Sequence, residues 1–501
     1  MRKLFTLLFV AVTAIAARAS DYNVPITVTV NGELSEQMGV ITIVENNGLY
    51  DLTLKNFVLQ NESMSLGVGN VELKGMKPYQ DGDATLLLTK ETITITDGDD
   101  PNVDIWMGSL LPPVPVDLRA KLEGGRLRCC IDINLESMGQ VIQVVIGDGY
   151  QIPNASFEAW HTSTDSYVEP NGWHSFESAT GNWASLAGHH IEKSDDAHSG
   201  DASARIFATS VWGVVANGTM TTGRMNAGSM SATDTKNNAY LDMSKTDTDG
   251  NGDPYYIPLY SRPDSVVAWV KFKQCKANSS HPYATISAVI TDGTYYQDPE
   301  DKTYDNVVAK AKNNMIATTN GQWKRISVPF VYTDNAVDPQ AVLITVSTNA
   351  DPGQGSADDE VLVDDIAFVY NATVSAISIK GEAVPGFSTG KTDYEMEQDE
   401  AITADDIEVT TDGEASNIVK TVEQEDGQYV CTVVALGADM SAMSSYVVRV
   451  KSNMTAIHDQ RTVVKQSATY YTLDGRQVKT LLPGKTYICR KADGSTAKIR
   501  M

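Results

Sequence analysis

The stretch Glu360-Val-Leu-Val-Asp364-Asp365-Ile366-Ala-Phe368 decides the fold. Its apolar residues alternate around two adjacent carboxylates, which is typical of a strand with one buried face. Since successive side chains point to opposite faces, only one of Asp364 and Asp365 can share the face of Ile366. An earlier stretch, Asn154-Ala-Ser-Phe157-Glu158-Ala-Trp160, followed by Pro170-Asn-Gly-Trp173, also reads as strand and turn. We expect the two stretches to be the first and last strands of one β-sandwich, lying side by side.

The rest of the chain has the same character. Short runs of Val, Ile, Thr and Tyr recur between Gly, Asn and Asp turns, and no 3.6-residue apolar period is sustained. The 501 residues exceed what one hydrophobic core accommodates. We therefore predict an all-β, multidomain protein. The predicted parts are residues 1–19, a signal; 20–148, a barrel; 149–372, a jelly roll; 373–453, a small sandwich; and 454–501, a short β module.

Residues 1–19 have the three parts of a secretory signal. Met1-Arg2-Lys3 is basic, the next residues to Ala16 are apolar, and Ala17-Arg-Ala19 supplies small residues for cleavage. The apolar run is short for a membrane span, and no other long apolar run follows. We expect cleavage, no membrane span in the mature chain, and a secreted or cell-surface location.

Composition excludes some partners. The formal charge of -25 disfavours nucleic acids and anionic membranes, which attract basic surfaces. The five cysteines have no disulfide or zinc spacing. We expect them to be small buried side chains.

The segments flanking the jelly roll resemble known modules. Residues 20–148 show alternating runs and a Gly124-Gly125 hairpin, and a meander of about eight to ten strands hides its edges by closing. This part resembles the calycin-like barrel of secreted bacterial proteins, with an interior expected to be filled by side chains. Residues 373–453 resemble Ig-like or cadherin-like spacers. In residues 454–501, Leu473-Asp-Gly-Arg-Gln-Val478 and Pro483-Gly-Lys-Thr-Tyr-Ile488 resemble the C-terminal sorting module of type IX-like secretion, which implies an outer-surface secretion machinery as partner.

The central part resembles the carbohydrate metabolism domain family of secreted bacterial proteins and, more distantly, calcium-containing jelly-roll carbohydrate-binding modules. The residues that carry this resemblance are Asn154, Phe157, Glu158, Trp160, Pro170, Gly172, Trp173, His198, Gly200, Ser203, Arg262, Pro263, Trp323, Asp364, Asp365 and Ile366. The resemblance implies a jelly roll that binds a polysaccharide or other glycan.

Aromatic side chains offer flat faces for sugar rings, and six of the seven tryptophans lie in the central part. Trp269 and Trp323 fall inside strand patterns, which predicts core positions. The candidate sugar-binding residues are Trp160, Trp173, Trp183, Trp212, Tyr255 and Tyr256. Packing in the domain interior is the alternative for each of them.

The acidic residues suggest a structural calcium ion. Glu158 would approach Asp364 or Asp365 if the first and last strands are neighbours, and oxygen ligands suit Ca²⁺. A buried Asp364 requires a partner, which backbone amides could also supply. A second cluster, Asp247-Thr-Asp249-Gly-Asn251-Gly252-Asp253, matches half of an EF-hand loop, but Pro258 at its twelfth position excludes a complete one. We expect a solvated turn there, with a weak calcium site as the alternative.

The preferred function is a secreted, non-catalytic carbohydrate-binding protein. A glycoside hydrolase or lyase is the first alternative, with its two carboxylates taken from Glu158, Glu169, Glu177 and Glu192. A structural or adhesive surface protein without a sugar site is the second alternative. Exposed central tryptophans would count against the structural alternative, whereas two carboxylates that face each other across an aromatic cleft would favour the hydrolase.

Overall fold

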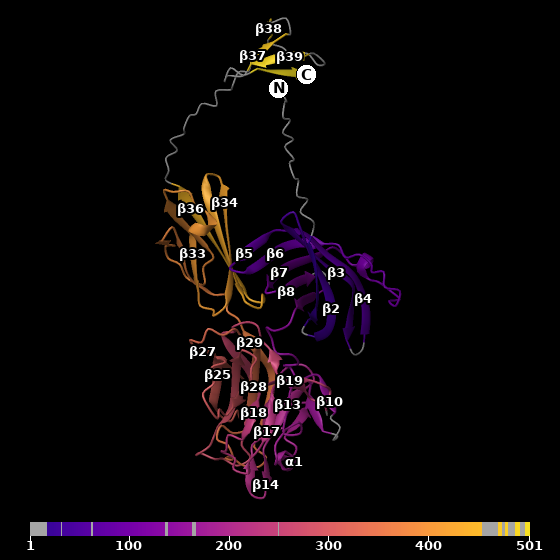
Figure 1. Ribbon diagram of the computed structural model, residues 1–501, viewed down its shortest axis with the longest axis vertical. Helices are drawn as coiled ribbons and strands as arrows, with labels where there is room; N and C mark the ends of the chain where they lie inside the picture. Colours follow the sequence, from indigo (N-terminus) through magenta and orange to yellow (C-terminus); the bar gives the residue numbers. More distant parts are fainter. Residues whose placement is uncertain are drawn as a thin grey trace, which may run out of the picture.

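The computed structural model describes residues 18–31, 33–61, 64–135, 139–162, 167–248 and 250–452, and also 469–472, 476–478, 486–490 and 496–500. Strands form nearly all of its regular structure, so the predicted all-β, multidomain class is confirmed (Figure 1). The predicted signal, residues 1–19, lies outside the described residues apart from Arg18 and Ala19, which begin β1. No helix in the described ranges has the length and apolar character needed to cross a membrane.

The N-terminal unit is one nine-stranded antiparallel sheet in the order β4-β3-β2-β1-β9-β8-β7-β6-β5. Its strands are β1 (Arg18–Val30), β2 (Glu33–Asn46), β3 (Leu49–Asn61), β4 (Met64–Met76), β5 (Pro78–Asp81), β6 (Ala84–Ile93), β7 (Val114–Glu123), β8 (Arg126–Leu135) and β9 (Gln140–Ile146), with a short 3-10 helix η1 (Gly108–Leu110).

This sheet curls around its own apolar core, and its closure is partial. The edge strands β4 and β5 do not pair with each other; isolated bridges join β4 to the segment after β6, Gly67 to Trp106 and Asn70 to Thr96. The predicted Gly124-Gly125 hairpin is confirmed between β7 and β8. Both glycines have positive φ, 56° and 77°, as a two-residue hairpin turn requires.

The central unit packs a five-stranded sheet, β12-β13-β29-β22-β26, against a six-stranded one, β16-β28-β23-β25-β27 with β21 beside β28. Its elements are β10 (Trp160–Thr162), β11 (Val168–Pro170), α1 (Ala184–Ala187), β12 (Ile191–Ser194), β13 (Ser203–Phe207), β14 (Thr209–Val211), β15 (Val214–Ala216), β16 (Thr219–Thr221), β17 (Arg224–Ala227), β18 (Asn237–Tyr240), β19 (Asp242–Thr246), β20 (Pro254–Tyr255), β21 (Ile257–Pro258), β22 (Ser265–Lys273), β23 (Ala284–Thr291), β24 (Gln297–Asp298), β25 (Val307–Ile316), β26 (Lys324–Pro329), β27 (Val331–Tyr332), β28 (Ala341–Ser347) and β29 (Glu360–Val369).

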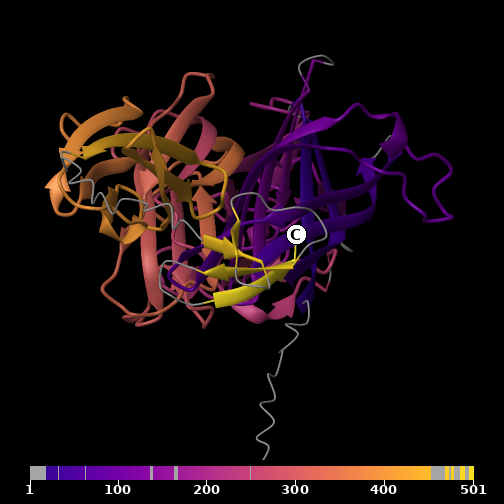
Figure 2. The same ribbon diagram turned by 90° about the horizontal axis from the view of Figure 1, so that it is seen from above.

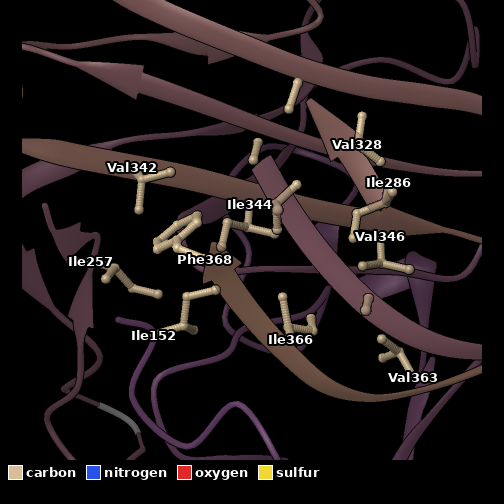
Figure 3. Packing of buried hydrophobic residues seen from close by; sticks show 14 of the residues in the cluster. Ile152, Ile257, Ile286, Val328, Val342, Ile344, Val346, Val363, Ile366 and Phe368 are labelled. Atoms are coloured by element: carbon tan, nitrogen blue, oxygen red, sulfur yellow. The ribbon is translucent and has the colours of Figure 1, made fainter. Parts of the chain in front are cut away.

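The main core lies between these two sheets. Ile366 and Phe368 of β29 point toward Val342, Ile344 and Val346 of β28 (Figure 3). Burial of this many aliphatic side chains is the main favourable contribution to folding of the unit, at about 25 cal/mol for each Å² of apolar surface removed from water.

The two stretches that bracket the central unit are neighbours, as predicted. The N–H of Ile366 donates to the carbonyl of Ala155 at 3.0 Å. The first stretch is, however, a turn and not a strand: Phe157 has φ 55°, and β10 begins only at Trp160. The side chain of Asn154 holds this turn by accepting from the N–H of Ala159 and donating to its carbonyl, at 3.0 and 2.8 Å.

Residues 374–452 form the predicted seven-stranded sandwich. Its sheets are β31-β30-β33 and β32-β36-β35-β34, in which β32 and β36 run parallel. Its elements are β30 (Val374–Ile379), β31 (Glu382–Ala383), β32 (Asp393–Gln398), the 3-10 helix η3 (Ala404–Asp406), β33 (Ile407–Thr411), β34 (Ser416–Glu425), β35 (Gln428–Gly437) and β36 (Met443–Ser452).

This sandwich lies against the N-terminal sheet, as both views show (Figures 1 and 2). A shared apolar cluster joins Leu86 and Cys130 of that sheet to Leu436 and Met440. Arg128 is 4% exposed and donates to the carbonyls of Asp439 and Gly147, at 3.0 and 2.8 Å. The two units therefore contact each other through buried apolar side chains and through hydrogen bonds of Arg128.

The C-terminal part is described only in four short strands. They are β37 (Thr469–Tyr471), β38 (Gln477–Val478), β39 (Thr486–Arg490) and β40 (Thr496–Arg500), in the sheet order β38-β37-β39-β40. Much of the predicted sorting module, residues 454–501, lies outside the described residues.

Candidate functional site

The candidate site is a pocket of about 310 Å³ in the central unit, beside the hairpin of β14 and β15. Trp183, at the start of α1, and Trp212, at the hairpin tip, both line it. The lining also contains polar side chains from several strands and from the segment after β28, among them Asn226, Asn238, Asp298, Lys312, Asn314 and Asn349. Flat apolar faces beside amide, carboxylate and ammonium groups suit a polar ring compound.

An exposed apolar rim surrounds the pocket. Trp212 is 72% exposed, and Leu186, Val214 and Met230, which also line the pocket, are 37%, 43% and 50% exposed. Exposed apolar side chains that gather around a concavity mark a binding surface more often than scattered ones do.

Trp212 occupies an unusual backbone position. It is the first residue of the two-residue turn between β14 and β15, with φ 51°, and Gly213 follows with φ 82°. Turns of this type prefer Asn-Gly, because bulky residues with positive φ are strained. A strained residue that presents its side chain to solvent at a pocket is a reason to infer function there.

Two of the predicted sugar-binding residues are core residues, which corrects the sequence-based expectation. Trp173 is 0% and Tyr255 1% exposed. Trp173 packs on Phe157 with ring centroids 5.2 Å apart, and Tyr255 packs on His174 at 4.5 Å. Their ring faces are already occupied and cannot receive a sugar.

Two further predicted residues lie away from the pocket lining. Trp160 is half-buried against the main core, and its indole N–H donates to the carbonyl of Phe157. Tyr256 is half-buried against a smaller apolar cluster that contains Met225 and Tyr296. The structure thus brings together Trp183 and Trp212 of the predicted set.

Glu158 and Asp364 both hold the loop of residues 198–202. Asp364 is 0% exposed and accepts from the N–H groups of His198 and Ser199, at 2.7 and 3.2 Å. Glu158 accepts from the N–H groups of Asp201 and Ala202, at 3.0 and 3.2 Å. Asp364 is buried, but not on the face of Ile366. A β-bulge at Asp365, which has φ 46°, shifts the register, so Asp364 lies beside Trp269 while Val363 and Ile366 both face the main core. Backbone amides are the partners of Asp364.

Asp364 and Asp365 both contact the 198–202 loop, but they differ in burial. Burial, with a smaller contribution from the charge of Asp365, raises the pKa of Asp364 to about 6. Asp365 is partly exposed, pairs with Nδ1 of His198 at 2.6 Å and accepts from the hydroxyl of Ser199 at 2.8 Å. Calcium at Glu158, Asp364 and Asp365 stays a prediction.

Trp269 and Trp323, expected in the core, are half-buried near the 198–202 loop. The ring of His198 stacks on Trp269 at 3.7 Å, and the indole N–H of Trp323 donates to Asp196 at 3.2 Å. The strand pattern placed these residues in strands or at strand ends correctly, but it did not reveal which face was covered.

Buried carboxylates gather near β11. Ser175 donates its N–H and hydroxyl to Oε1 of Glu169, and its hydroxyl also lies 2.7 Å from Glu177. Burial raises the pKa of Glu169 to about 8 and that of Glu177 to about 7. Glu169 also forms, with His161 and Asp247, the one group of His, Cys, Asp and Glu with metal-compatible spacing among the residues that the structure describes.

Comparison with known proteins does not assign the chain to a family. The chain matches no protein-family model, and a search of curated proteins finds no significant match. The arguments for function therefore come from the chain itself.

Sequence reasoning missed most of the pocket lining. Asn226, Lys312 and Asn349 lie in separate elements and carry no motif. The one available signal was the Trp212-Gly213 pair between two β-rich runs, which has the spacing of a hairpin turn with an unsuitable residue at its tip.

Proposed function

We propose that this chain is a non-catalytic carbohydrate-binding protein that acts outside the cytoplasm, and that the pocket between Trp183 and Trp212 receives the glycan. The observation that carries this proposal is the position of two indoles on one concave surface beside amide-bearing side chains. Indole faces pack against the C–H groups of sugar rings, and amides hydrogen-bond hydroxyls. The signal-like residues 1–19 and the sorting-like C-terminal part support the location.

Binding is favoured over hydrolysis by the carboxylates of the pocket. Asp298 is the single Asp or Glu in the lining among the described residues. A glycosidase of the usual kind needs two carboxylates across the scissile bond. Glu169 and Glu177, which share the hydroxyl of Ser175, do not line the pocket.

A glycan array probed with the full chain tests this proposal. We expect binding to at least one polysaccharide or oligosaccharide, weakened about 10-fold or more in both Trp183→Ala and Trp212→Ala, as for other central aromatic contacts. Met315→Ala is the matched control, since Met315 is 69% exposed and lies outside the pocket. Folded protein that binds no glycan, or binding that both tryptophan variants leave intact, would contradict the proposal.

A further inference from the structure

A second group of polar side chains lies outside the pocket, where the β10–β11 hairpin meets the 247–253 loop. His161 and Glu169 are direct cross-strand partners, and Asp247 follows β19. One donor atom from each lies within 4.8 Å of the others. Glu169 and Asp247 are 1% and 3% exposed. The expectation of a solvated turn is therefore wrong for Asp247, whose carboxylate is directed inward.

Two acceptor atoms of this group, Nε2 of His161 and Oε2 of Glu169, are buried without a hydrogen-bond partner. Nδ1 of His161 lies 3.0 Å from Oδ1 of Asn171, an acceptor, so in the neutral ring Nδ1 carries the proton and Nε2 offers its lone pair. This Nε2 is buried without a hydrogen-bond partner. Oε1 of Glu169 accepts from Ser175, and Oε2 is buried without a partner.

His174 adds a third lone pair of the same kind. Its Nε2 lies 3.2 Å from the carbonyl of Pro254, to which it donates. Its Nδ1 is then unprotonated, has no hydrogen-bond partner and lies 3.9 Å from Oδ2 of Asp247. Buried acceptors that face one another repel unless a cation or a proton lies between them.

Lysine and arginine do not supply that cation. In the described part of the chain, no Lys or Arg forms an ion pair with Glu169 or Asp247; the one such contact of Asp247 is with His174. Arg224 lies over the ring of Tyr255, 4.8 Å from its centroid, and the hydroxyl of Tyr255 donates to Asp247. Glu169 and Asp247 thus have no Lys or Arg as a direct partner.

Gly250 of the 247–253 loop lies directly against the donor atoms of Asp247 and His161. A Cβ atom at Gly250 would lie 2.3 Å from Oδ2 of Asp247 and 2.8 Å from Nε2 of His161. Any other residue would push into the space between these two donor atoms. The N–H of Gly250 also donates to Oδ1 of Asp247 at 3.2 Å, which orients the carboxylate.

We propose that His161, Glu169 and Asp247 bind one divalent transition-metal ion, and that Zn²⁺ is the ion that fits them. An imidazole nitrogen with two carboxylate oxygens is a donor set for Zn²⁺, whereas Ca²⁺ prefers oxygen alone. The hydrogen bond from Nδ1 of His161 to Asn171 orients the ring so that Nε2 is directed to the ion. Metal-bound histidines commonly donate their other ring nitrogen in this way. His174 lies beside the group, with its Nδ1 3.9 Å from Oδ2 of Asp247.

The test uses the full chain after treatment with a chelator. Titration calorimetry with ZnCl₂ should show one ion per chain, and Co²⁺ should bind with the visible absorption of a coordinated ion. His161→Gln should lower the Zn²⁺ affinity at least about 10-fold. His281→Gln is the matched control, because His281 pairs with Asp351 at an exposed position elsewhere and its loss should leave binding unchanged.

A second variant covers the case in which His161→Gln does not fold. Asn171→Ala removes only the partner of Nδ1, and we expect a loss of Zn²⁺ affinity of about 10- to 100-fold. The proposal is overturned if the native chain binds neither ion, or if His161→Gln and Asn171→Ala bind Zn²⁺ as tightly as the native chain. Displacement of Zn²⁺ by equimolar Ca²⁺ overturns the choice of metal.

Discussion

The N–H of Ile366 donates a hydrogen bond to the carbonyl of Ala155, and this contact ties the end of the central unit to its beginning. Gln151 repeats the connection through its side-chain amide, which pairs with both backbone groups of Phe368 at 2.9 and 2.8 Å. Glu158 and Asp364 are thereby brought to the same loop, residues 198–202. Residues at the two ends of the unit thus position one segment between them.

Trp212→Asn should stabilise the protein and weaken glycan binding. Asn tolerates positive φ, so the substitution relieves backbone strain of about 1 kcal/mol or more. The free energy of unfolding, measured in urea, should rise while affinity for the glycan falls. Stability equal to or below that of the native chain would show that Trp212 is not strained.

Trp173→Ala should destabilise the protein by about 3–5 kcal/mol, because it empties a fully buried site next to Phe157. Urea unfolding followed by circular dichroism measures this. Trp212→Ala serves as the control and should change stability by no more than about 0.5 kcal/mol, since its side chain is largely exposed. Equal effects of the two variants would contradict the assigned burial.

Asp364 should make stability depend on pH. Its pKa of about 6 in the folded protein lies above its ordinary value near 4, so the folded state binds the proton more tightly. The free energy of unfolding should therefore fall as the pH rises from about 4 to about 6. Asp364→Asn removes the titrating group, and comparison of urea unfolding across this range isolates it. An identical slope in both proteins would refute the assignment.

Cys275 should be the thiol that reacts first in the folded protein. It is exposed, whereas Cys129, Cys130, Cys431 and Cys489 are buried, and burial raises the pKa of the Cys431 thiol to about 11. Titration with a chromogenic disulfide should release one equivalent rapidly, and the rest only after denaturation. Cys275→Ser should abolish the rapid phase; a rapid phase that persists would contradict the burial of the others.

Arg128→Met should weaken the contact between the N-terminal sheet and the 374–452 sandwich. The carbonyls of Asp439 and Gly147 would lose their donor in a buried place, at a loss of about 1–3 kcal/mol. Differential scanning calorimetry should show a lower transition temperature for these two units. Lys193→Met, a change at an exposed position outside the contact, is the control and should leave the transition unchanged.

Local sequence patterns predicted much of the fold. The strand expected at residues 360–368 appears as β29 (Glu360–Val369), and the hairpin expected at Gly124-Gly125 joins β7 to β8. These features depend on side chains a few positions apart, so the sequence alone contains the information.

The same reasoning could not predict that Trp173 is buried and that Trp212 is exposed. Both follow loop-like sequence, yet one is buried and the other is 72% exposed, because burial depends on which distant strands pack over each ring. The metal-compatible group shows the same limit: His161 and Glu169 are hairpin partners, but Asp247 joins them only through the path of its loop.

By itself, then, the sequence determined that this protein is built of strands and where a strand such as β29 begins and ends. Alternation and turn chemistry act over neighbouring residues, and that is sufficient for such properties. Only the tertiary structure decided that Trp183 and Trp212 share a pocket and that three orphaned lone pairs surround Asp247. Those sites are made by segments far apart in the chain, whose meeting depends on the packing of the whole central unit.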